Sequence, residues 1–260
     1  MPGPRHDRSD TLDKEERKNK SKTSVIRRTA SDVIVVCLVC LVALSGFRIY
    51  TALKSYRADR SVYESVSEQA SASGDSIDFE ALSSINPDVI GWLRYEGTAI
   101  DYPVVQGQDN EKYLGVLFDG TKGDSGTLFA DCVTEDPFRQ FNTIIYGHHM
   151  KDGSMFAGLK KLKDPDWAAG HPVIELFTPD GNYHLQVWAF LNQPSDSNIY
   201  TTNIKSEDSQ RQYIELIEKL ASYTTDVSVA SGDSLAVLST CAYEYQNARY
   251  IVVCKIVPWE

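Results

Sequence analysis

Seven short runs rich in β-branched and aromatic residues limit what the chain after Pro87 can fold into. The runs cover residues 99–105, 126–130, 143–146, 173–177, 183–190, 235–240 and 250–257. Runs of this length, bounded by clusters of turn residues, are typical of β-strands. Their number and irregular spacing predict a closed or sandwich-like β domain.

Helical patterns interrupt this β domain at a few places. Residues 207–223 carry apolar side chains on one face, at the i, i+3, i+4, i+7 spacing of an amphipathic helix. These side chains are Tyr213, Leu216, Ile217 and Leu220. Residues 154–162 predict a second, shorter helix. Asp78 can cap a third over residues 79–85, which Pro87 ends.

A basic tail and a mainly apolar run lie at the N-terminus. Residues 1–30 hold nine Lys and Arg against five Asp and Glu, and residues 33–47 carry no charge. The apolar character continues past Arg48, and an arginine near a helix end can extend its guanidinium to the membrane interface. A tail of this length is unusual for a cleaved signal peptide. We therefore expect an uncleaved signal-anchor helix over residues 31–53.

The charge distribution predicts how the chain is placed across a membrane. By the positive-inside rule, residues 1–30 form a basic cytoplasmic tail, and the chain after the anchor is extracellular. Residues 54–77 are mostly polar and predict a helical stalk or linker, and residues 78–260 form one extracellular domain. From Arg48 onward there are 30 acidic and 17 basic residues, which disfavours a nucleic-acid partner.

A thiol, an imidazole and a guanidinium are placed at the ends of predicted strands. Leu238-Ser239-Thr240-Cys241 closes one strand, Arg249 opens the next, and Ile145-Tyr146-Gly147-His148 closes a third. Two strands joined by a short loop bring Cys241 and Arg249 together. A thiol attacks a carbonyl only as the thiolate, which a nearby His or Arg favours. The pattern allows two interpretations: nucleophilic catalysis by Cys241, or a buried structural cysteine beside a surface arginine.

The cysteine count supports a working thiol. Besides Cys37 and Cys40 in the apolar run, the chain has three cysteines, Cys132, Cys241 and Cys254. An odd number leaves at least one thiol free. No histidine lies at zinc-ligand spacing from these cysteines, so no metal site is expected.

Several segments, in this order and at these separations, resemble the class B sortases, the membrane-anchored cysteine transpeptidases of Gram-positive bacteria. They are Ile85-Asn-Pro-Asp-Val-Ile-Gly-Trp92, Ile100-Asp-Tyr-Pro-Val-Val-Gln106, Asp109-Asn-Glu-Lys-Tyr-Leu114, Ile145-Tyr-Gly-His-His-Met-Lys-Asp-Gly-Ser-Met-Phe156 and the Leu-Ser-Thr-Cys…Arg block. The chain has Val237 where the family has Thr, a conservative change on a strand. The resemblance implies an eight-stranded β-barrel with N-terminal helices and one late helix. The extracellular domain, residues 78–260, would then be the sortase catalytic domain.

The resemblance also implies site residues. His148, Cys241 and Arg249 match the catalytic set, with His149 as the rival of His148. Neighbouring side chains on a strand face opposite ways, so only one of the two histidines should point at Cys241. The residues that match the substrate groove are Asn110, Leu114, Tyr146, Ser239 and, in the loop before the late helix, Tyr200. Each also has a structural reading, as core, turn or packing residue. No residue is identified behind His148, and Glu244 and Asn247 are unsupported candidates.

The function implied is a transpeptidation that needs no metal or organic cofactor. The enzyme would cleave a C-terminal sorting signal of the Asn-Pro-x-Thr-x type in a secreted protein, after the Thr. It would then pass the acyl group to an amine of a peptidoglycan peptide or its lipid-linked precursor. The alternatives are a secreted cysteine hydrolase, a pilin-polymerising sortase, and a non-catalytic domain that binds surface proteins.

Overall fold

The computed structural model of the chain describes residues 8–73, 76–242 and 246–259. The chain divides into two compact units, Met1–Lys54 and Ser55–Glu260. Helix α1 (Arg8–Ala70) carries the apolar run. Within the described residues, it is the one helix that is long and apolar enough, by length and composition, to cross a membrane. Its large apolar side chains from Leu38 to Leu53 are exposed.

The last part of α1 belongs to the second unit and is packed rather than exposed. Asp59, Tyr63, Val66 and Ala70 are all buried. They are spaced by four, three and four residues, which places them on one face of the helix. The segment expected to be a stalk is therefore helical as far as Ala70. Its polar composition concealed the narrow buried face. Strands β1 (Ser71–Ser73) and β2 (Ser76–Ile77) then form a small separate sheet.

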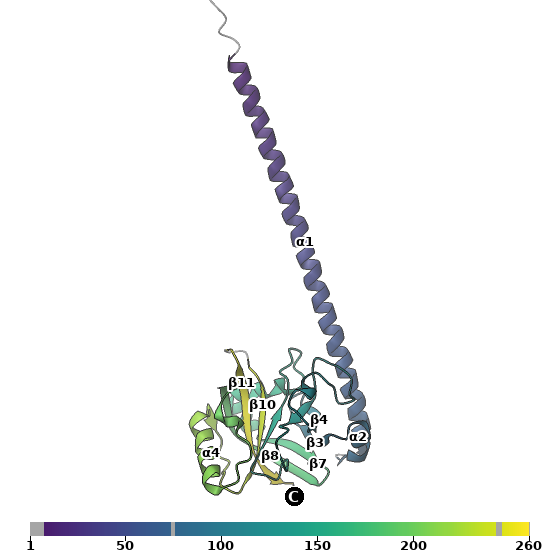
Figure 1. Cartoon of the computed structure of the whole chain (residues 1–260), viewed down its shortest axis with the longest axis vertical. Coiled ribbons are helices and arrows are strands. Elements are labelled where there is room, and N and C mark those ends of the chain that lie inside the picture. Colours follow the sequence, from purple (N-terminus) through teal and green to yellow (C-terminus); the bar gives the residue numbers. More distant parts are fainter. Residues whose placement is uncertain (1–7, 74–75, 243–245, 260) are drawn as a thin grey trace, which may run out of the picture. The chain divides into compact units, whose positions relative to one another are not determined.

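Eight strands of the second unit close into a barrel, as the resemblance implies (Figure 1). Their order around the ring is β11-β10-β6-β5-β4-β3-β7-β8, and β8 also pairs with β11, which closes the ring. The strands are β3 (Val89–Arg94), β4 (Asp101–Val105), β5 (Leu128–Ala130), β6 (Asn142–Tyr146), β7 (Val173–Thr178), β8 (Gly181–Pro194), β10 (Ser234–Cys241) and β11 (Ala248–Pro258). The pairs β4–β5 and β6–β10 are parallel and the others are antiparallel. The short β9 (Tyr223–Thr224) pairs only with β8.

The helices of this unit lie against the barrel. Figure 1 shows α4 (Glu207–Leu220) beside β8 and α2 (Phe79–Ile85) beside β3. Asp78 caps α2, as predicted, by accepting a hydrogen bond of 2.9 Å from the amide of Ala81. The remaining short helices are α3 (Pro165–Gly170) and the 3₁₀ segments η1 (Lys112–Leu114), η2 (Phe156–Lys163) and η3 (Asn198–Tyr200).

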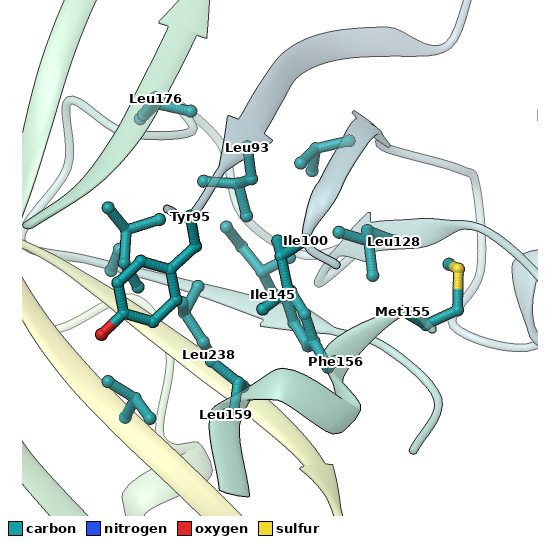
Figure 2. Close-up of a cluster of buried hydrophobic side chains, with 14 of the residues drawn as sticks. Leu93, Tyr95, Ile100, Leu128, Ile145, Met155, Phe156, Leu159, Leu176 and Leu238 are labelled. Atoms are coloured by element: carbon teal, nitrogen blue, oxygen red, sulfur yellow. The ribbon is translucent and has the colours of Figure 1, made fainter. Parts of the chain in front are cut away.

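Alternation along β10 separates two hydrophobic clusters. Ala236 and Leu238 belong to the cluster inside the barrel, where Figure 2 shows Leu238 among side chains from several strands and η2. Leu235 and Val237 belong to the second cluster, which includes the buried face of α4. Because strand side chains alternate between faces, Ser239 and Cys241 continue the face of Leu235 and Val237. The thiol therefore lies on the outer face of the barrel.

The barrel contains one strand beyond the seven expected, and one expected helix is a 3₁₀ segment. Strand β3 was not predicted, because Gly91 interrupts its apolar run. The region expected as a helix over residues 154–162 is the 3₁₀ segment η2. Gly158 lies within it, and a Cβ there would come 2.8 Å from the Cβ of Thr98. Helix α4 ends at Leu220, three residues earlier than expected.

We predict that acid removes a stabilising interaction at the start of β3. Asp88 accepts hydrogen bonds from Lys112 Nζ at 2.8 Å and from the buried Tyr113 hydroxyl at 2.6 Å, and these lower the pKa of Asp88. Because the pKa of Asp88 is lower in the folded state than in the unfolded state, its ionised carboxylate stabilises the fold at pH values above the unfolded-state pKa. This contribution to the free energy of unfolding is lost as the pH falls through the folded-state pKa.

Asp88→Asn should therefore lower the free energy of unfolding at neutral pH by about 1 kcal/mol. The difference from wild type should shrink as the pH falls below the ordinary Asp value of about 3.9 and through the lowered folded-state pKa of Asp88. Urea unfolding of both proteins at several pH values measures this. A difference that stays constant over the whole pH range would contradict the assignment.

Candidate active site

The parallel pairing of β6 with β10 brings the predicted histidine and thiol to one end of the barrel. Ser239 pairs with Tyr146, and the Gly147 amide donates a hydrogen bond of 3.1 Å to the Ser239 carbonyl. Cys241 and His148 each follow two residues after this pair. Parallel neighbours lie about 4.8 Å apart and run in the same direction. The two side chains therefore leave adjacent strand ends on the same face.

The antiparallel pairing of β10 with β11 adds the guanidinium. Cys241 and Arg249 are direct cross-strand partners, and the Ala242 amide closes the hairpin by donating to the Ala248 carbonyl at 2.8 Å. Directly opposite residues share a face, with Cβ atoms about 5 Å apart. One N–H of Arg249 donates to the Ala248 carbonyl at 3.0 Å, which holds the side chain across the strand end.

The imidazole of His148 is held by a backbone carbonyl. Its Nε2 lies 2.8 Å from the carbonyl oxygen of Leu114. A carbonyl only accepts, so the proton of the neutral ring is on Nε2. This leaves Nδ1 as the nitrogen that can exchange a proton with a reacting group. No carboxylate or amide is needed to fix this tautomer.

The two adjacent histidines point in different directions. His148 lines a pocket together with Cys241, whereas His149 packs near Tyr250, with ring centroids 6.0 Å apart. Gly147 permits the turn that separates them. A Cβ at Gly147 would come 2.4 Å from a methyl carbon of Leu128 and 2.7 Å from the ring of Phe156. The glycine before His148 is therefore required by close packing.

All eight residues predicted for the site line one pocket of about 340 Å³. They are Asn110, Leu114, Tyr146, His148, Tyr200, Ser239, Cys241 and Arg249. The pocket draws on six segments: the loop before β5, β5 itself and the ends of β6, β8, β10 and β11, with η3 at its side. Cys241, His148 and Arg249 are all partly exposed, so a ligand can reach them.

Linked polar and aromatic contacts form one wall of this pocket. The Tyr200 hydroxyl and Ser239 Oγ are 2.8 Å apart, and the rings of Tyr200 and Tyr146 stack at 6.2 Å. The Tyr146 hydroxyl donates to Asp131 Oδ2 at 2.9 Å. Burial, followed by the negative charge of Asp131, raises the pKa of Tyr146. Tyr146 therefore remains a neutral hydrogen-bond donor.

Asn110 and Leu114 also line the pocket. The side-chain oxygen of Asn110 accepts from the Cys132 amide at 2.8 Å, so this residue joins two loops as well as facing the pocket. The Leu114 side chain is 46% exposed, which excludes the core role considered for it. It forms an apolar edge next to His148.

Sequence reasoning missed several residues of the site. The Leu114 carbonyl has no sequence signal, because every residue type carries one. Phe129 lies within the predicted strand at residues 126–130 and Asp131 follows it, and no motif marked either residue. Of the two candidates for a third member, Asn247 has a φ of 62° in the turn before β11 and does not line the pocket. Glu244 lies outside the described residues.

Comparison with known proteins identifies the class to which this barrel and pocket belong. A family model described as the sortase domain matches residues 93–257, which is more than half of the chain. These residues contain the whole pocket and all the barrel strands except the start of β3 and the last residue of β11. The chain belongs to the sortase family.

The relatives define the type within that family. Sortase B of Staphylococcus aureus is 29% identical over 233 residues, which cover 86% of this chain and 96% of that protein. Sortase B of Listeria monocytogenes is 35% identical over 178 residues, which cover 68% and 72%. A structure of a Staphylococcus aureus sortase B–substrate complex matches with a TM-score of 0.73 at 29% identity, covering 80% of this chain and 100% of that one. The protein is a sortase B-type cysteine transpeptidase.

We predict that the bond between Tyr200 and Ser239 shapes the groove for a peptide substrate. Tyr200→Phe and Ser239→Ala should each raise KM roughly threefold to tenfold, because a net hydrogen bond contributes about 1 kcal/mol. The double variant should be no worse than either single variant, since both remove the same bond. Steady-state cleavage kinetics of the four proteins measure this. Additive effects in the double variant would show that the two residues act separately.

Proposed function

We propose that Cys241 is the nucleophile, His148 the general acid and base, and Arg249 the electrostatic stabiliser of a transpeptidation. The observation that carries this proposal is the convergence of the three side chains, from β10, β6 and β11, in one partly exposed pocket. Each residue type has the chemistry its role requires.

The reaction proceeds in two steps that balance. Cys241 Sγ attacks the carbonyl carbon of a Thr in the substrate, the C–N bond to the next residue breaks, and a thioester forms. His148 Nδ1 takes the proton of the Cys241 thiol and then gives it to the departing amine. In the second step, an incoming amine attacks the thioester, and His148 Nδ1 takes its proton and passes it to the departing sulfur of Cys241. Throughout both steps, Nε2–H remains on the Leu114 carbonyl.

Arg249 stabilises the negative charge on the carbonyl oxygen. Its cross-strand position opposite Cys241 puts the guanidinium next to the atom that develops charge. One N–H is used by the Ala248 carbonyl, and the planar group offers further donors to an oxyanion. Charge-assisted hydrogen bonds of this kind are the strongest available to such a site.

The substrates follow from the groove and from the relatives. The stacked Tyr146 and Tyr200, the Ser239 hydroxyl and the apolar Leu114 side chain form a groove for an extended peptide. A substrate complex is known for the Staphylococcus aureus sortase B. For this chain, we propose a secreted protein with a C-terminal signal of the Asn-Pro-x-Thr-x type. The accepting amine is that of a peptidoglycan peptide or its lipid-linked precursor, so the product is an anchored surface protein.

The apolar helix supports a membrane location for this reaction. In the proposed arrangement, residues 1–30 are cytoplasmic and residues 31–53 span the membrane. Residues 54–77 connect this membrane span to the catalytic domain, residues 78–260, outside the cell. The exposed apolar side chains of α1 between Leu38 and Leu53 fit a lipid environment. The basic tail fits the cytoplasmic side.

The full-length chain in detergent micelles, incubated with a fluorogenic Asn-Pro-Gln-Thr-Asn peptide and an amine, tests the proposal. We expect cleavage between Thr and Asn and an amine-dependent ligated product. Cys241→Ala and His148→Ala should lose at least about a hundredfold in kcat/KM. Arg249→Lys should lose roughly tenfold or more, because lysine keeps the charge but not the planar donor group.

Two matched variants serve as controls. Cys132→Ala removes the other partly exposed thiol beside the groove, and His149→Ala removes the neighbouring imidazole. Both should retain activity, with folding checked by circular dichroism. Cleavage that yields only the free acid at every amine concentration would favour a hydrolase. Activity in Cys241→Ala would refute the mechanism.

A further inference from the structure

The end of α1 contacts the loop that precedes β5 through two buried side chains. The carboxylate of Asp59, which is 5% exposed, accepts hydrogen bonds from both the amide and the hydroxyl of Ser125, each at 2.9 Å. One turn further along, the Tyr63 hydroxyl donates to the Gly126 carbonyl and lies 3.1 Å from Thr127 Oγ1. The helix therefore fixes Ser125, Gly126 and Thr127 by side-chain contacts to consecutive residues.

Gly126 lies directly against Tyr113 and Leu114, which come earlier in the same loop, in η1. Its φ of 55° is in the left-handed region, and a Cβ there would come 2.3 Å from the Tyr113 carbonyl oxygen and 3.0 Å from that of Leu114. The next residue, Thr127, donates its amide to the Tyr113 carbonyl at 2.9 Å. The backbone at Gly126 therefore sets where the carbonyl of Leu114 can lie.

The Leu114 carbonyl is the group that holds the imidazole of His148, at 2.8 Å from Nε2. A short physical path thus runs from the Tyr63 hydroxyl to Gly126, from Gly126 to the Leu114 carbonyl, and from there to His148. The first and last steps are hydrogen bonds. In the middle step, Gly126 lies so close that an added Cβ would come 3.0 Å from the Leu114 carbonyl oxygen. The path begins in α1, outside the residues 93–257 that match the sortase domain.

We propose that Tyr63 and Asp59 of α1 are positioning residues for His148. By holding the Gly126 side of the loop, they keep the Leu114 carbonyl where it fixes the Nε2–H tautomer and aims Nδ1 at the reacting groups. The inference rests on the proposed role of His148. It gives the end of α1 a part in the chemical step in addition to its part in the core.

A purely structural role for Tyr63 would make the same contacts, so the test needs a matched control. Tyr95 is also a buried tyrosine that donates to a backbone carbonyl, that of His171, at 2.9 Å. It lies in the barrel core, and its bond does not touch the loop of Leu114. Tyr63→Phe and Tyr95→Phe each remove one hydroxyl and leave the ring in place.

The experiment measures steady-state kinetics and histidine ¹⁵N spectra of full-length chains in detergent micelles. Tyr63→Phe should lower kcat roughly tenfold, with KM for the peptide changed less than about twofold, because misplacing a catalytic group affects the chemical step more than binding. The Nε2 and Nδ1 signals of His148, identified by their loss in His148→Gln, should shift. Ser125→Ala, which removes one Asp59 contact, should show a smaller change of the same kind.

Tyr95→Phe should lose comparable thermal stability but keep the wild-type kcat and His148 signals. If Tyr63→Phe also keeps the wild-type kcat and His148 spectrum, the positioning role is refuted while the mechanism stands. If both variants lose kcat equally, the effect is general destabilisation, and the inference is again refuted. If His148→Gln retains activity, the proposed function itself fails, and the two failures are thereby distinguished.

Discussion

The parallel ladder between β6 and β10 is the constraint on which the site depends. It pairs Tyr146 with Ser239 and so aligns the ends of two strands that are nearly a hundred residues apart in the chain. A shift of this register by one residue would turn Cys241 or His148 to the opposite face. Two buried clusters resist such a shift, because they take alternate side chains of β10. Leu235 and Val237 pack in the cluster with α4, and Ala236 and Leu238 pack inside the barrel. The buried core thus maintains the spacing of the reactive groups.

The imidazole of His148 is held by the Leu114 carbonyl, so its orientation depends on a loop rather than on a third side chain. A carbonyl accepts from Nε2 whether the ring is neutral or protonated, so the ring can keep its orientation when Nδ1 gains or loses a proton. Orientation then depends on how firmly the loop of Leu114 is held. The Asp88–Tyr113 contact holds one side of that loop, and α1 holds the other. The glycines at 126 and 147 allow the close approaches that make this possible.

Much of the barrel could be predicted from the sequence because its strands alternate or form continuous apolar runs. The seven expected strands are all present, and α2 occupies residues 79–85 as predicted. Strand β3 was missed because Gly91 breaks its pattern, although the glycine is needed where Phe177 approaches at 3.0 Å from its Cβ position. The buried face of α1 was missed because it consists of one residue per turn, and one of those residues is Asp59.

The site was predictable where side chains carry the chemistry and hidden where the backbone does. Cys241, His148 and Arg249 could be singled out because a thiol, an imidazole and a guanidinium at strand ends are chemically conspicuous, and the structure brings them to one pocket. The choice of His148 over His149 came from the resemblance, and the structure places His148 in the pocket and His149 near Tyr250. The Leu114 carbonyl and the left-handed turn at Gly126 depend on tertiary contacts that sequence spacing does not encode.

Locating the acyl group on the enzyme would decide whether Cys241 is the nucleophile. The full-length chain would be quenched in acid during turnover of the peptide, digested, and mapped by mass spectrometry. We expect a thioester on Cys241 alone, which disappears when an amine is added before the quench. An acyl group on Cys132, or on no cysteine while the peptide is being cleaved, would contradict it.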